Sequence, residues 1–163
     1  MKVVFLDRDG VINKKIENSY VLDWKDFKFL PDVDKAIKLL NEKDIPVIVI
    51  SNQACVGKGL ITRQELDDIN DCMVKVLNTK GAHIDAVFVC PHRSDENCDC
   101  RKPKTGLFRQ ASKKYDIDFK SSWFIGDSPE DMEAGKSAGT NTYLLKKGEN
   151  LKSVVEKILK EWK

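Results

Sequence analysis

The chain has 163 residues, of which 41% are hydrophobic and 33% are charged, and its formal net charge is +2. A chain of this size buries a core without disulfides, so we expect a single domain over residues 1–163. The small net charge, with lysines and glutamates interspersed, argues against a nucleic-acid partner. No apolar stretch is long enough to span a bilayer and no secretory signal opens the chain, so we expect a cytoplasmic protein without a membrane partner.

Five short apolar runs predict five β-strands, separated by segments of helical length. The runs cover residues 3–6, 46–50, 86–90, 123–126 and 142–145. Strands inside a parallel sheet are covered on both faces, so they read as unbroken apolar stretches rather than alternating ones. The order of elements therefore predicts an α/β fold, a Rossmann-like doubly wound parallel sheet, with no insertion large enough for a cap domain.

Several helices carry recognisable start signals. Pro31 is expected to open a helix that runs to residue 43, Thr62 forms a capping box with Glu65, and Pro129 occupies the first position of another helix. Apolar residues at helical spacing over 151–162 predict a final helix that docks on the sheet. The longer loops, which should frame a site, cover residues 13–30, 52–61 and 91–104.

Two aspartates follow the first predicted strand, in the segment Asp7-Arg8-Asp9-Gly10. In an open parallel sheet the chemistry lies at the carboxyl ends of the strands, where both side chains can enter one crevice. Such a pair can hold Mg²⁺ and attack a phosphorus atom. Taken alone, the four residues favour a simple Asp-Gly turn after a strand.

Three further polar motifs follow other predicted strands. They are Ser51-Asn52 after the second strand, Arg101-Lys102-Pro103 after the third, and Asp127 after the fourth. In a doubly wound sheet these motifs converge with the first aspartates on one crevice, which predicts an active site. Asp131 either reaches this site or caps a helix through its position three residues after Ser128.

A metal-binding pattern occupies the third of the long loops. Three cysteines and a histidine form the set Cys90-x-His92-x₅-Cys98-x-Cys100, and the residues between them are too polar for a core. This is the Cys₃His composition of a closed structural zinc site. An odd count of five cysteines also argues against a disulfide framework. We expect the zinc to fix the loop rather than to catalyse.

In order along the chain, these motifs resemble those of haloacid-dehalogenase (HAD) superfamily phosphatases, and within them the D-glycero-D-manno-heptose 1,7-bisphosphate 7-phosphatase family. The resemblance covers nearly the whole chain and is most specific where the zinc loop runs into Arg-Lys-Pro. It implies removal of the 7-phosphate of a heptose bisphosphate in nucleotide-activated heptose biosynthesis. Histidinol-phosphate phosphatases, which have a similar zinc loop, and other small sugar-phosphate phosphatases are the alternatives.

The needs of phosphoryl transfer, together with the resemblance, imply a role for each site residue. Asp7 would form an aspartyl-phosphate, while Asp9 would protonate the leaving alkoxide and then activate water. Mg²⁺ is expected on the Asp7 carboxylate, the Asp9 carbonyl and Asp127. The phosphoryl oxygens are expected to contact Ser51 and Lys102, with Lys104 as a rival to Lys102. Further substrate contacts are expected from Asn52, Gln53, Arg101 and Tyr20.

The sequence departs from the family pattern in its loops. The 14–20 loop is longer, the spacer between His92 and Cys98 is shorter, and Cys55 occupies a position where the family usually has glycine. No catalytic group is lost, and without a cap domain the loops must supply specificity. We expect a monomer. A receiver-like phospho-acceptor module and a zinc-stabilised binding protein with a silent site are the alternatives of another class.

Overall fold

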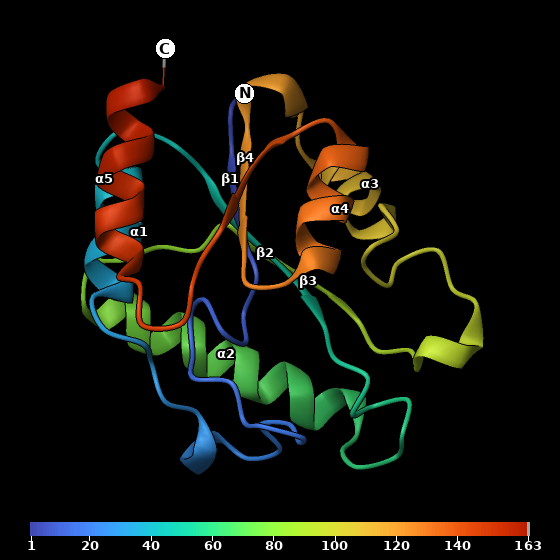
Figure 1. Ribbon diagram of the computed structural model, residues 1–163. Helices are drawn as coiled ribbons and strands as arrows, with labels where there is room; N and C mark the ends of the chain where they lie inside the picture. Colours follow the sequence, from blue (N-terminus) through green and yellow to red (C-terminus); the bar gives the residue numbers. More distant parts are fainter. Residues whose placement is uncertain (163) are drawn as a thin grey trace.

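The computed structural model describes residues 1–162 and contains a parallel sheet of five strands in the order β3-β2-β1-β4-β5 (Figure 1). Val4 in β1 pairs with Val47 in β2 and with Trp123 in β4, so β1 lies at the centre. The sheet confirms the predicted doubly wound α/β architecture. The strands are β1 Val4–Leu6, β2 Val47–Asn52, β3 Ala86–Cys90, β4 Trp123–Gly126 and β5 Asn141–Leu144.

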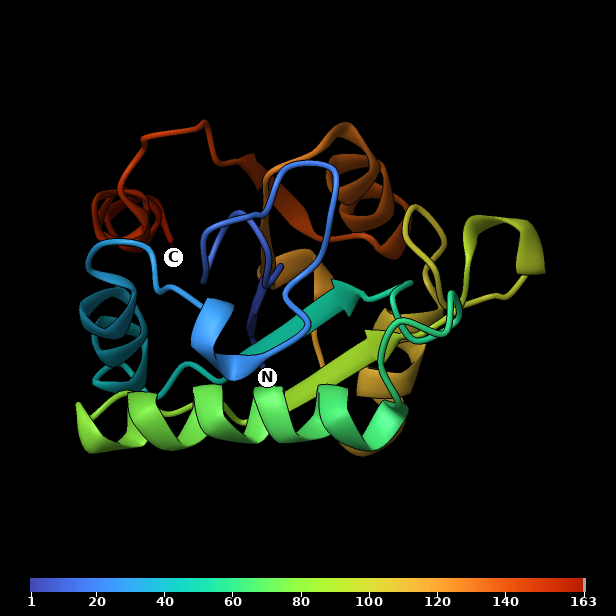
Figure 2. The ribbon, with the colours of Figure 1, turned by 90° about the horizontal axis from the view of Figure 1, so that it is seen from below.

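Helices cover both faces of the sheet, as Figures 1 and 2 show. Apolar residues of α1, α2 and α5 pack in one core cluster on one face, whereas those of α3 and α4 pack in a second cluster on the other. Two cores on opposite faces explain why the central strands are apolar throughout. The helices are α1 Val33–Asn41, α2 Arg63–Thr79, α3 Gly106–Lys114, α4 Pro129–Ala138 and α5 Leu151–Glu161.

Two expectations about the strands are corrected. The second strand extends beyond its apolar run because Ser51 and Asn52 still pair with β3. Burial on both faces was expected for every strand but is wrong for β5, which lies at the sheet edge and leaves Leu144 42% exposed. An edge strand lacks one neighbour, so an apolar run does not guarantee burial there.

One helix start also differs from its prediction. Pro31 does not open α1, because Asp32 adopts a left-handed conformation with φ of 60° and the helix begins at Val33. The capping box of Thr62 and Glu65 and the position of Pro129 are confirmed. The final helix is confirmed as α5, which packs beside α1 (Figure 1).

The topology places polar side chains around one point of the sheet. The chain leaves β1 towards β2 and β3 on one side, and β4 and β5 lie on the other, so the strand order switches at β1. Ligands of open α/β sheets bind at such a switch point, beyond the carboxyl ends of the strands. Within residues 1–162, no helix is both long and apolar enough to cross a membrane.

The capping box of α2 offers a direct test of local stability. Thr62 Oγ accepts a hydrogen bond from the Glu65 backbone N–H at 3.0 Å, and the Glu65 carboxylate accepts one from the Thr62 N–H at 3.2 Å. Replacement Thr62→Ala should lower the free energy of unfolding by about 1 kcal/mol, measured by urea denaturation. Thr62→Ser keeps the hydroxyl and is the control; equal stability of all three proteins would contradict this role.

Candidate active site

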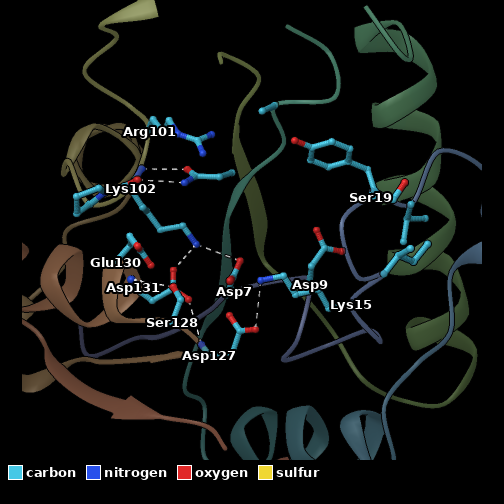
Figure 3. Close-up of a pocket in the computed structure, with 16 residues that line it drawn as sticks. Asp7, Asp9, Lys15, Ser19, Arg101, Lys102, Asp127, Ser128, Glu130 and Asp131 are labelled. Atoms are coloured by element: carbon cyan, nitrogen blue, oxygen red, sulfur yellow. Dashed lines mark hydrogen bonds and ion pairs between the residues drawn. The ribbon is translucent and has the colours of Figure 1, made fainter. Parts of the chain in front are cut away.

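A cavity of about 370 Å³ opens at the carboxyl ends of the central strands (Figure 3). Its walls come from the segment that follows β1, the end of β2, the start of α4 and the three long loops. The prediction that these loops frame the site is confirmed. Seven of the predicted site residues line it: Asp7, Asp9, Tyr20, Asn52, Arg101, Lys102 and Asp127.

Lys102 reaches into the centre of this cavity and meets two carboxylates there (Figure 3). Its Nζ lies 3.0 Å from Asp7 Oδ1 and 2.7 Å from Asp131 Oδ1, and it donates to the Ile50 carbonyl at 3.1 Å. Burial alone would lower the pKa of Lys102, but the two carboxylates outweigh it and raise that pKa. The ammonium is therefore a fixed positive charge beside Asp7.

Asp7, Asp127 and Asp131 form a cluster in which one oxygen of each lies within 4.8 Å of the others. Burial, reinforced by the other two carboxylates, raises the pKa of Asp7 well above its ordinary value despite Lys102. Burial also raises the pKa of Asp127. A hard cation such as Mg²⁺ binds ionised carboxylates, and its charge would offset the repulsion that raises these pKa values, so the gathered oxygens are a suitable ligand set.

Glycine at position 10 permits this cluster. Gly10 has φ of +88°, and a Cβ there would lie 1.9 Å from Asp127 Oδ2. Only a residue without a side chain lets the loop after β1 approach Asp127 so closely. The backbone at Gly10 therefore leaves room for the carboxylate cluster that could hold a metal ion.

The structure settles the two interpretations of Asp131. Its backbone N–H is capped by Ser128 Oγ at 3.2 Å, so it does belong to the first turn of α4. Its carboxylate, however, contacts Lys102 and accepts from the Asp127 N–H at 3.1 Å. Asp131 is therefore part of the site as well as of the helix start, which motif spacing alone left open.

Asp9 lies apart from the carboxylate cluster and has its own set of donors. Its side chain contacts Arg8, and Asn13 Nδ2 and Gln53 Nε2 each donate to it at 2.8 Å. Burial opposes ionisation, but Arg8 and these two amides hold the pKa of Asp9 below its ordinary value. In the resting site Asp9 is an ionised carboxylate held from several sides.

The second-strand motif serves mainly to hold its neighbours. Asn52 lines the cavity, but its amide pairs with the backbone N–H and carbonyl of Lys102 at 3.0 and 3.2 Å. Ser51 and Gln53 are 1% and 0% exposed and are not among the cavity-lining residues. Gln53 links Ser51 Oγ, at 2.8 Å, to Asp9. Direct substrate contact by Ser51 and Gln53 stays a prediction.

The loop side chains complete the rim. Tyr20 lines the cavity and accepts a hydrogen bond from Lys58 Nζ at 2.7 Å, which joins the first two loops. Lys15, which the motifs did not single out, lies with its Nζ 4.0 Å from Asp127 Oδ2 (Figure 3). No sequence signal marks Lys15 beyond its place in the first loop.

Cys55 is buried, its thiol 3.8 Å from Gln53 Oε1, and burial raises its pKa. This environment fits a packing role.

The four predicted zinc ligands come together. The Cys90 Sγ atom lies 3.6 Å from Cys98 Sγ and 3.5 Å from His92 Nδ1, which in turn lies 3.2 Å from Cys100 Sγ. Sulfurs bound at about 2.3 Å to a tetrahedral zinc stand roughly 3.8 Å apart, so the set fits the ion. The Cys90–Cys100 separation of 2.8 Å would have to widen.

One thiol of the Cys₃His cluster has a lowered pKa. Burial opposes it, but hydrogen bonds from the Arg101 and Cys100 backbone and with the neighbouring thiols lower the pKa of Cys98 to about 6. The thiolate is the metal-binding form of cysteine. The cluster ends one residue before Arg101, so ordering it also orders the segment that carries Lys102.

Comparison with known proteins first gives the class. A family model described as HAD-hydrolase-like matches residues 99–162. The protein is an enzyme of this class, a phosphatase.

Individual relatives narrow the class. The D-glycero-beta-D-manno-heptose-1,7-bisphosphate 7-phosphatase of Bordetella bronchiseptica is 35% identical over 156 residues, covering 96% of this chain and 87% of that protein. The D-glycero-alpha-D-manno-heptose-1,7-bisphosphate 7-phosphatase of Photorhabdus laumondii is 37% identical, covering 91% and 84%. The chain belongs to the D-glycero-D-manno-heptose-1,7-bisphosphate 7-phosphatase family.

A solved structure shows the same fold. The crystal structure of D,D-heptose 1,7-bisphosphate phosphatase from B. bronchiseptica, complexed with magnesium and phosphate, superposes with a TM-score of 0.92. It is 33% identical and covers 99% of both chains. That neighbour binds both ligands that the carboxylates and Lys102 of this cavity suit.

The Cys₃His cluster gives the second test. Replacement Cys98→Ser should lower zinc content, measured by atomic absorption, and the melting temperature together, because metal-binding free energy of about 10 kcal/mol contributes to folding. Cys72→Ser removes a partly buried free thiol of α2 and is the matched control, with zinc unchanged. Full zinc content in Cys98→Ser would exclude this residue as a ligand.

Proposed function

We propose that this phosphatase removes the 7-phosphate of D-glycero-D-manno-heptose 1,7-bisphosphate through an aspartyl-phosphate on Asp7. The observation that carries the chemistry is the contact of Asp7 with buried Lys102 beside Asp127 and Asp131. The names of the relatives support the substrate. We further propose that the chain acts as a monomeric single domain.

The first half-reaction transfers the phosphoryl group to the enzyme. An Asp7 oxygen forms a bond to phosphorus as the bond from phosphorus to the sugar oxygen breaks. Asp9, which is ionised in the resting site, takes up a proton when the negatively charged phosphate enters beside it. The departing alkoxide takes that proton, since a sugar alkoxide is a poor leaving group. Water then attacks phosphorus, gives a proton back to Asp9, and releases phosphate and the free Asp7 carboxylate.

Positive groups make this attack feasible. A phosphate monoester repels an anionic nucleophile, so its oxygens must be neutralised in place. The Lys102 ammonium supplies one fixed charge, and the Ser51 hydroxyl a donor. Mg²⁺, held by the carboxylates of Asp7 and Asp127 and the Asp9 carbonyl, would neutralise further charge when bound. Asp131 fixes Lys102 and belongs to the same ligand cluster.

The zinc cluster has an indirect part in this proposal. A closed Cys₃His site has no open position for substrate, so its role is to order the loop. That loop presents Arg101 to the cavity, and Asn52 then fixes the backbone of Lys102. Arg101 and Lys15 on the rim are suitable partners for the phosphate that remains on the product.

The substrate proposal is tested by comparing phosphate release from both anomers of heptose 1,7-bisphosphate and from histidinol phosphate. We expect kcat/KM for one heptose anomer to exceed that for histidinol phosphate by at least about 100-fold and to vanish with chelator, because a second phosphate adds charged contacts. The relatives include enzymes named for each anomer, so the assay also assigns the preference. Preference for histidinol phosphate would contradict the substrate but keep the mechanism.

The nucleophile is tested by replacement Asp7→Asn. The amide cannot form the acyl phosphate, so kcat should fall by roughly 1000-fold or more while zinc content and melting temperature are kept. The control Asp116→Asn makes the same change at an exposed carboxylate and should retain full activity. Undiminished phosphate release from a clean Asp7→Asn preparation would exclude Asp7 as the nucleophile.

A further inference from the structure

Arg8, between the two active-site aspartates, is the largest fully buried side chain of residues 1–162. Its exposed fraction is 0%, whereas the Asp9 side chain remains 21% exposed and lines the cavity. Burying a guanidinium is costly unless its donors are paired, so an arginine here requires a specific set of partners.

The guanidinium divides its donors between two elements. Arg8 Nε and Nη2 donate to Asp9 Oδ1 at 3.3 and 3.1 Å, and Nη2 also lies 3.4 Å from Oδ2. Nη1 donates to Asn70 Oδ1 of α2 at 2.9 Å, and the group lies 5.7 Å from the centre of the Phe27 ring. Arg8 is thus clamped between a helix, an aromatic ring and the Asp9 carboxylate.

Neighbouring amides act on the same carboxylate. Asn13 and Gln53 donate to the two oxygens of Asp9 from other directions. Arg8 itself does not line the cavity, so it meets Asp9 from the protein side. A carboxylate held in this way has one side-chain orientation, with its accessible edge towards the cavity.

We infer that Arg8, supported by Asn70, is a positioning residue that fixes the Asp9 carboxyl in line with the leaving oxygen of the substrate. The inference rests on the proposed role of Asp9 in that reaction. The proton passes from Asp9 to the alkoxide as the phosphorus–oxygen bond breaks, and such a transfer needs hydrogen-bond geometry between the two oxygens. Lysine offers a point charge in place of the planar fork, so Arg8→Lys should not restore the orientation.

The test compares two leaving groups. An alkyl phosphate such as the heptose bisphosphate needs the proton, whereas p-nitrophenyl phosphate has an acidic leaving group and needs it much less. The ratio kcat/KM covers the steps up to departure of the alcohol, so it isolates this transfer. In Arg8→Lys we expect kcat/KM to fall by at least about tenfold for the alkyl phosphate and by less than about threefold for p-nitrophenyl phosphate.

A second variant leaves Arg8 in place. Asn70→Leu removes the support of Nη1 without touching the active-site cavity and should show the same selective loss, to a smaller extent. Asn78→Leu makes the identical change at an exposed position of the same helix and should match the wild type. A crystal structure of Asn70→Leu should show the Asp9 carboxylate displaced.

The outcomes separate the inference from the proposed function. Equal losses for both leaving groups, or no loss for either, would overturn the positioning role in favour of a purely structural one, as would an unmoved Asp9 in Asn70→Leu. Wild-type rates address the proposed function independently. If the wild type does not hydrolyse the heptose bisphosphate, that substrate is wrong, and the same ratio is measured with the alkyl phosphomonoester it hydrolyses best.

Discussion

The contact of Lys102 with Asp7 and Asp131 is the interaction on which the site depends. Three carboxylates within 4.8 Å repel one another, and the buried ammonium of Lys102 lies between two of them. Lys102 comes from a loop, not from a strand, so its position has to be enforced. The Asn52 amide holds its backbone, and the zinc-ligand cluster ends two residues before it.

The division of labour follows the fold. Asp7 and Asp127 leave the ends of neighbouring central strands, β1 and β4, where the backbone is fixed by sheet pairing. The groups proposed to select the substrate, including Tyr20, Lys15 and Arg101, stand on loops. Loops carry specificity because they change without disturbing the scaffold. We therefore expect the longer first loop and the short spacer of the zinc loop to affect substrate preference rather than catalysis.

Local sequence signals predicted most of the fold and the position of the site. The apolar runs located all five strands, and motifs at the carboxyl ends of parallel strands must meet whatever the details of packing. Contacts that depend on tertiary packing could not be predicted from the sequence. Arg8 donates a hydrogen bond to Asn70, 62 residues away, and the buried Gln53 amide donates one to Asp9. The prediction that Pro31 opens α1 was wrong because the left-handed backbone of Asp32 has no strong sequence marker.

The most direct test of the account is to trap the phosphorylated enzyme. A reaction with substrate is quenched within milliseconds, treated with borohydride, which reduces an acyl phosphate to an alcohol, and analysed by peptide mass spectrometry. The account predicts reduction at Asp7, only when substrate and Mg²⁺ are present, and none at Asp9 or Asp127. Reduction at a different carboxylate, or turnover with no trapped carboxylate at any quench time, would contradict covalent transfer to Asp7.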